Sequence, residues 1–154
     1  MIIIMLDDIF AFLRPRAVAR RSFVKGDHLF RRGDPVRVMF LVTNGCANLV
    51  RYQEDGGPAV LQRARQGTVL AEASVFSDHC DAVAAMATEV VLVAIGEILR
   101  LLNEDHVFAL EWTRHLSNEL QQTRKRAEIL ALRTIAARLD AWLTWSDGDL
   151  PRKG

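Results

Sequence analysis

The chain has 154 residues, 50% of them hydrophobic and 25% charged, with 20 basic side chains against 19 acidic ones. This apolar fraction excludes a disordered chain, and the counts of 9 glycines and 4 prolines exclude collagen-like and low-complexity classes. The formal charge of +1 excludes a chain that binds polyanions over its whole surface. Two cysteines do not make a disulfide framework, so we expect a reducing compartment and a cytoplasmic protein.

The N-terminal residues predict an amphipathic helix and no membrane anchor. Residues 1–6 are apolar, but they lack a basic leader and are followed by Asp7 and Asp8. No run of the chain reaches the 18 or so apolar residues that a membrane-spanning helix needs. The helix is expected from Ile4 to Leu13, and one apolar face carries Leu6, Ile9, Phe10 and Leu13.

From Ser22 to about Ile95, short apolar runs alternate with turn residues. The runs are 38–42, 47–50, 69–70 and 90–93. Short β-branched runs with frequent turn residues predict an antiparallel β-barrel or sandwich. Residues 54–57, Glu-Asp-Gly-Gly, stand between two such segments and predict a β-hairpin, since glycine takes positive φ at little cost.

From about Asn103 the apolar pattern becomes helical. A narrow stripe with spacings of three and four is typical of a coiled-coil seam, and it consists of Trp112, Leu116, Leu120, Thr123, Ala127, Leu130 and Thr134. No glycine or proline lies between Glu104 and Leu143, so we expect one helix of roughly 55–60 Å at 1.5 Å per residue. A small barrel covers only part of that length. We therefore favour a parallel homodimer through positions 112, 116, 120, 123, 127 and 130 over a helix folded back on its own barrel.

After Leu130 a second apolar face appears, which indicates another neighbour; it comprises Leu132, Ile135, Leu139, Trp142 and Leu143. Residues 146–151 are expected to break the helix. The predicted organisation is therefore an N-terminal helix and barrel over 1–102, a dimerisation helix over 103–145 and a linker over 146–154.

The segment from Gly67 to Phe76 reads as a strand end, a tight turn and one helical turn that begins near Glu72. Unpaired backbone N–H groups at such a turn favour an anion. Glu72 also fits a simple first-turn acid that the helix dipole stabilises. The residue types alone leave both interpretations open.

Three ordered motifs support a resemblance to a known family. The pattern G-x-x-x-F-x-x-G-[DE] matches Gly26, Phe30, Gly33 and Asp34, and V-x-x-G matches Val42 and Gly45. The frame G-x-x-x-G-E-x-x-x-F matches Gly67, Glu72 and Phe76, with Ala71 in place of the second glycine. From about Phe23 to Leu143 the sequence resembles the sensor domain of the Crp/Fnr family of bacterial transcription regulators.

The resemblance implies a mainly β fold with α-helices: a double-stranded β-helix (jelly roll, cyclic-nucleotide-binding-like) followed by a long C-terminal dimerisation helix. It implies an effector-sensing and dimerisation domain with no enzymatic activity. On this resemblance we expect a ligand to reorient the dimer helix, and DNA to be bound only through a domain absent from these residues, with 146–154 as the linker to it. No motif of a catalytic nucleophile, such as G-x-S-x-G, contradicts this expectation.

The resemblance also implies which residues contact the ligand. They are Ala71, Glu72, Ala73, Cys80, Asp81 and Thr123. In nucleotide-binding relatives the carboxylate at the position of Glu72 accepts the ribose 2′-OH, and a polar helix residue like Thr123 contacts the purine. An arginine followed by serine or threonine holds the cyclic phosphate, and those positions are Cys80 and Asp81 in this chain.

The loss of that arginine predicts weak or absent binding of cAMP and cGMP. No arginine or lysine occurs from Gln66 to Glu97. An ion pair at 4 Å is worth about 4 kcal/mol at an effective dielectric constant of about 20, and each 1.4 kcal/mol is about tenfold in affinity. Three arginines on neighbouring strands are alternative phosphate ligands: Arg51, Arg63 and Arg65.

Two other functions keep the same fold: a stand-alone ligand-binding module, and a haem or redox sensor. The segment 78–81, Asp-His-Cys-Asp, contains good metal ligands, but one adjacent His-Cys pair is not a metal-ligand spacing. We therefore expect no metal, and the effector and any cofactor stay unknown. A redox pair of Cys46 and Cys80 is left open, and the basic run from Arg14 to Arg37 is expected to be a solvated rim.

Overall fold

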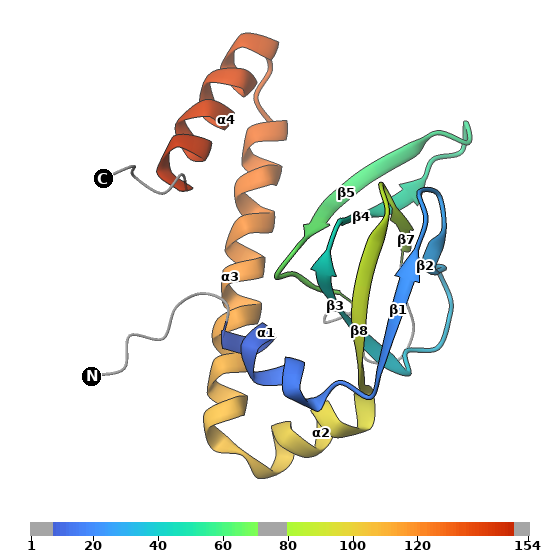
Figure 1. The fold of residues 1–154 in the computed structure, drawn as a ribbon. Helices are drawn as coiled ribbons and strands as arrows, with labels where there is room; N and C mark the ends of the chain where they lie inside the picture. The colour runs from blue at the N-terminus through green and yellow to red at the C-terminus, as the bar shows by residue number, and fades with distance from the viewer. Residues whose placement is uncertain (1–7, 71–79, 150–154) are drawn as a thin grey trace. The chain divides into compact units, whose positions relative to one another are not determined.

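The computed structural model describes residues 8–70 and 80–149, which fall into two compact units, Met1–Trp112 and Thr113–Gly154 (Figure 1). The first unit opens with helix α1 (Asp8–Leu13) and the 3-10 helix η1 (Arg14–Arg16). Ile9 and Leu13 of α1 are buried, as the predicted apolar face requires. Leu6, the first residue of that face, lies outside the described residues.

Two four-stranded antiparallel sheets make up the barrel. The first has the order β1–β8–β3–β6, with β1 (Ala19–Phe23), β8 (Thr88–Ala94), β3 (Val38–Asn44) and β6 (Val69–Leu70). The second has the order β2–β7–β4–β5, with β2 (His28–Phe30), β7 (Asp81–Ala84), β4 (Cys46–Tyr52) and β5 (Pro58–Arg65). Consecutive strands lie in different sheets except for β4 and β5, which form a hairpin in the second sheet. The predicted jelly-roll class is confirmed.

Turns link the strands where the sequence predicted them. The β4–β5 hairpin closes over residues 54–57. Gly45, between β3 and β4, has φ +87°, and a Cβ there would lie 2.3 Å from the carbonyl oxygen of Ala87. Only glycine fits that turn, because a side chain meets both backbone strain and a backbone atom.

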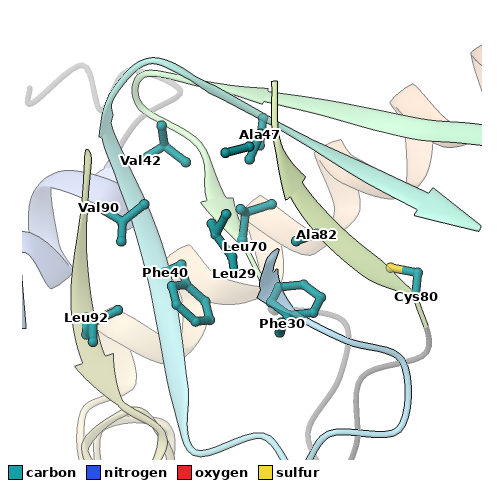
Figure 2. Close-up of a cluster of buried hydrophobic side chains, with 12 residues drawn as sticks. Leu29, Phe30, Phe40, Val42, Ala47, Leu70, Cys80, Ala82, Val90 and Leu92 are labelled. Carbon is teal, nitrogen blue, oxygen red and sulfur yellow. The ribbon is translucent and has the colours of Figure 1, made fainter. Parts of the chain in front are cut away.

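The first sheet is covered on both faces, which explains the continuous apolar runs of β3 and β8. Phe40 and Val42 of β3 face the second sheet and join Val90 and Leu92 of β8 in one core cluster (Figure 2). The alternate residues of both strands join a second cluster with the helices, made up of Met39, Leu41, Val91 and Val93 with Ile9, Leu13, Ile98, Phe108 and Trp112 among others. A strand buried on both faces reads as an unbroken apolar run.

The single helix predicted from residue 103 to 145 is wrong, because the chain breaks twice. Helix α2 (Ile95–Glu104) ends at Asp105, whose backbone is extended, and α3 (His106–Leu130) begins after it. The Asp105 carboxylate accepts a hydrogen bond from the Phe108 N–H at 3.0 Å. Asp105 therefore acts as the N-cap of a new helix.

The second break lies at residues 131–134, before α4 (Ile135–Asp149). The Thr134 hydroxyl accepts a hydrogen bond from the Ala137 N–H at 3.1 Å, which caps α4 in the same way. Helix α4 ends at Asp149, within the segment 146–151 where a helix break is expected. Among the described helices, none is long and apolar enough to span a bilayer.

Candidate functional site

The expected ligand site lies between the end of β6 and the start of β7. Residues 71–79 connect these strands and lie outside the described residues, so the predicted ligand contacts Ala71, Glu72 and Ala73 are not placed. The flanking residues are placed. They are Leu70 at the end of β6 and Cys80 and Asp81 at the start of β7.

Alternation along β7 sends Cys80 and Asp81 to opposite faces of the second sheet. Cys80, 3% exposed, and Ala82, fully buried, belong to the core cluster between the sheets, and Figure 2 draws Cys80 at the rim of that cluster. Successive side chains of a strand point to opposite faces, so Asp81 lies on the outer face. Cys80, which the family resemblance assigns to the position of the phosphate-binding arginine, is therefore a buried thiol in apolar surroundings.

The Asp81 carboxylate is engaged within the barrel. Its Oδ1 accepts a hydrogen bond from the Arg32 N–H at 2.8 Å, and its Oδ2 lies 3.3 Å from Nε2 of His28. Both contacts tie β7 to β2 and to the turn after it. The His28 and Asp81 side chains are 21% and 15% exposed, so the pair is largely shielded from water.

The inner face of β4 and β5 continues the inner face of β7. Leu49 pairs with Ala82 of β7 on one side and with Gln62 of β5 on the other. Directly opposed residues share a face of the sheet, so these three side chains form one row. Leu49 and Gln62 are half-buried, and Ala64, two residues on from Gln62, is fully buried.

Two of the three arginines considered as alternative phosphate ligands lie on the outer face of the second sheet. Arg63 and Arg65 flank Ala64 on β5, and Ala64 faces the core. Alternation therefore places both guanidinium groups on the outer face, and both are exposed. Arg51 is exposed near the end of β4, opposite Ala59.

The two cysteines are too far apart for a disulfide. Ala47, the residue after Cys46, pairs with Ala84, whereas Cys80 lies just beyond the pair of Val50 and Asp81 at the other end of the ladder. Five strand positions correspond to about 16 Å, against a Cα limit of about 7 Å for a disulfide. Within 8–70 and 80–149, no three metal-binding side chains cluster.

The predicted dimer residues differ in exposure along α3. Trp112 is buried against Phe108, with ring centroids 5.8 Å apart, in the core cluster of its own unit. The later positions of the stripe are exposed at Leu116, Leu120, Thr123, Ala127 and Leu130. The Thr123 hydroxyl donates a hydrogen bond to the Glu119 carbonyl at 2.9 Å.

Two further sets of charged groups are His115 of α3 and the basic run from Arg14 to Arg37. Burial lowers the pKa of His115 below its usual value, and the Glu119 charge acts in the opposite direction. Arg16 lies 4.2 Å from the centre of the Phe12 ring and 3.7 Å from Glu97, so it belongs to the helix packing. The other basic side chains of the run are exposed, as expected for a rim: Arg14, Arg20, Arg21, Lys25, Arg31, Arg32 and Arg37.

Sequence reasoning missed His28 and Gln62. His28 is 53 positions from Asp81 in sequence, and only the β2–β7 pairing brings the two together. Gln62 gave no usable signal, because the register of β4 and β5 shifts between Leu49 and Val50. A count of strand positions from the hairpin places Leu61 opposite Leu49 instead.

The chain is similar to known proteins over most of its length. Residues 20–105 match the family described as the cyclic nucleotide-binding domain. A global nitrogen regulator from Nostoc sp. is 25% identical over 127 residues, which cover 79% of this chain and 57% of that protein. Lysophospholipase nte1 from Neurospora crassa is 31% identical over 118 residues, covering 77% of this chain and 7% of that protein. The chain thus spans less than two thirds of either relative.

Solved structures confirm the architecture. FixK2 from Bradyrhizobium japonicum superposes with a TM-score of 0.77 at 20% identity, covering 88% of this chain and 69% of FixK2. The N-terminal domain of a transcriptional regulator from Streptomyces coelicolor A3(2) gives a TM-score of 0.59 at 25% identity, covering 76% of this chain and 85% of that domain. The resemblance drawn from the three sequence motifs is confirmed.

Proposed function

The chain belongs to the cyclic nucleotide-binding domain family, and from that premise we propose that it is the effector-sensing and dimerisation domain of a Crp/Fnr-type transcription regulator. The match to a global nitrogen regulator supports a regulatory role. In this proposal DNA is bound by a separate domain outside residues 1–154, and the regulator works in the cytoplasm without catalysing a reaction.

One observation supports the proposal for the ligand: Cys80 is 3% exposed in an apolar cluster, and the family resemblance assigns it to the position of the phosphate-binding arginine. A buried thiol offers no charge to a cyclic phosphate. Arg63 and Arg65 lie on the opposite face, and Arg51, two residues after Leu49, is exposed near the end of β4. Losing one ion pair at 4 Å is worth about 4 kcal/mol at an effective dielectric constant of about 20, or close to a thousandfold in affinity.

Isothermal titration calorimetry with cAMP and cGMP tests this proposal. We expect no saturable heat at micromolar nucleotide for the wild-type chain. Cys80→Arg restores the missing cation and is expected to gain affinity for cAMP, whereas Cys80→Ser is not. Low-micromolar binding of cAMP to the wild-type chain contradicts the proposal.

Dimerisation is supported by the exposed part of the α3 stripe. Leu116, Leu120 and Leu130 are 36%, 50% and 70% exposed, and they share the stripe with Thr123 and Ala127. Exposed leucines at spacings of three and four are typical of a coiled-coil seam. In the dimer, a bound effector favours one arrangement of the two α3 helices, and this population shift transmits the signal. Light scattering is expected to give twice the chain mass of 17.3 kDa, and a single-chain mass at all concentrations contradicts a dimer.

A further inference from the structure

We infer that one side of the barrel, formed by β1, β2 and the turns that follow them, is a docking surface for an acidic segment of a partner protein. This basic side consists of Arg20 and Arg21 of β1, Lys25 in the turn after β1, and Arg31 and Arg32 in the turn after β2. The inference goes beyond the proposed effector sensing, because it concerns the outside of the barrel and needs no ligand.

The topology gathers these five residues on one side of the barrel. β1 is the end strand of the first sheet, and β2 is the end strand of the second. A short turn joins the two strands, in which the Asp27 N–H donates a hydrogen bond to the Val24 carbonyl at 3.0 Å. Figure 1 shows the two strands next to each other. The end strands of both sheets and their turns therefore form one continuous side.

Charge is distributed unevenly along the chain. Residues 14–37 contain eight basic and two acidic side chains, a formal charge of +6, whereas the other residues together have −5. All five residues of the basic side are exposed. A surface of a single sign attracts a partner of opposite charge and speeds its association. The near-neutral total of the chain conceals this surface.

The carboxylates of this side are bound to the backbone and not to the basic side chains. Asp27 accepts a hydrogen bond from the Val24 N–H at 3.0 Å, and Asp34 accepts one from the Arg31 N–H at 2.9 Å. In the described part of the chain, none of the ion pairs involves a residue of the basic side. Its cations are therefore available to the carboxylates of a partner.

The side chains around the cations favour a protein partner over a nucleic acid. Val18 and Val24 flank β1 and are 69% and 66% exposed, so apolar contacts are available beside the charges. The aromatic residues of the segment, Phe23 and Phe30, are not exposed, so they offer no surface on which bases stack. Four of the five cations are arginines, whose planar guanidinium group binds a carboxylate through two hydrogen bonds.

Two peptides of opposite charge test the inference. The first is a capped peptide of glutamates around a central pair of valines, and the second has lysine in place of every glutamate. Each is titrated into the 15N-labelled full chain by NMR at physiological ionic strength. We expect the acidic peptide alone to bind and to shift the backbone amides of the basic side. Absence of binding at millimolar acidic peptide, or equal binding of both peptides, overturns the inference.

Charge reversal links the binding to the basic side. Arg20→Glu combined with Arg21→Glu is expected to weaken binding of the acidic peptide by at least about tenfold and to allow binding of the lysine peptide. The matched control is Arg63→Glu combined with Arg65→Glu, two exposed arginines of β5, which is expected to change the affinity less than about twofold.

Equal weakening by the two pairs shows that only net charge acts, and it overturns the inference. Urea unfolding confirms that each variant keeps the barrel. Lys25→Glu combined with Arg31→Glu, both in turns, replaces the first pair if that pair unfolds the chain.

Two further probes separate a protein partner from other polyanions. A peptide with serine in place of the valine pair is expected to bind about threefold weaker than the acidic peptide, because it loses the apolar contacts. A short DNA duplex with the same total charge as the acidic peptide is expected to bind more weakly than that peptide. Tighter binding of the duplex, or no effect of the valines, overturns the choice of a protein partner.

Discussion

The two units of the chain treat their large apolar side chains in opposite ways. In the first unit, Leu41 and Phe108 are fully buried and Ile98 is 1% exposed. In the second, Leu120, Leu130 and Ile135 are 50%, 70% and 81% exposed, and Ile129 is the one buried large residue among those described. The first unit completes its core within one chain. The second presents apolar surface of the kind that proteins use to bind partners.

The largest expected effect comes from opening the core of the first unit. Phe108→Ala is expected to lower the free energy of unfolding by about 3–5 kcal/mol, because a fully buried ring leaves a cavity. Leu110→Ala, two residues away but 59% exposed, is the matched control and is expected to cost less than about 0.5 kcal/mol. Urea denaturation measures both values. Equal losses of unfolding free energy in the two variants contradict the claim that only the buried face of this helix stabilises the first unit.

The β3–β4 turn gives the next largest effect. Gly45→Ala is expected to cost about 2–4 kcal/mol, since the new Cβ meets positive φ and the Ala87 carbonyl. Gly56→Ala has the same sign of φ but open space around it, and it is expected to cost about 1 kcal/mol. Thermal unfolding of the two variants separates the backbone strain from the collision. A similar loss in both means that the close approach at Gly45 has no energetic weight.

The contacts of Asp81 predict a moderate effect. Asp81→Ala removes the acceptor of the Arg32 N–H and the partner of His28, and is expected to cost about 1–2 kcal/mol. Asp81→Asn keeps an acceptor oxygen and is expected to lose less. Hydrogen exchange at the Arg32 amide reports the local consequence. Unchanged protection in Asp81→Ala contradicts the assigned hydrogen bond.

The smallest effect is a pH dependence from His115. Burial lowers its pKa in the folded chain, so the unfolded chain takes up a proton first as the pH falls. Stability therefore declines as the pH drops below the ordinary histidine value of about 6.5, until the folded chain is protonated as well. His115→Gln is expected to flatten this decline in urea midpoints measured between neutral and mildly acidic pH. An unchanged pH profile in the variant shows that His115 does not contribute.

The barrel was predictable because its signals are local. The apolar runs of β3 and β8, the hairpin at residues 54–57 and the glycine at position 45 all follow from short-range pattern and turn chemistry. The helix breaks were missed because the prediction relied on glycine and proline alone. Asp105 separates α2 from α3 and caps α3, and Thr134 caps α4, signals that the sequence contains.

The candidate site was predictable only in part, because its geometry depends on strand pairing. The sequence motif aligned Cys80 and Asp81 with the phosphate-binding pair, but alternation on β7 separates them onto two faces. The contact of Asp81 with His28 depends on a long-range register that includes an irregularity in β2. Ala71, Glu72 and Ala73 stay predictions from the family resemblance.

Sedimentation equilibrium tests the central claim, that the second unit is completed by a second copy and the first is not. The wild-type chain is expected to sediment as a dimer, and Leu116→Glu combined with Leu120→Glu as a monomer with an unchanged barrel transition. The matched control is Val107→Glu with Leu110→Glu, two exposed apolar positions of α3 in the first unit, which is expected to stay dimeric. A monomeric wild-type chain, or a stripe variant that remains dimeric, contradicts the account.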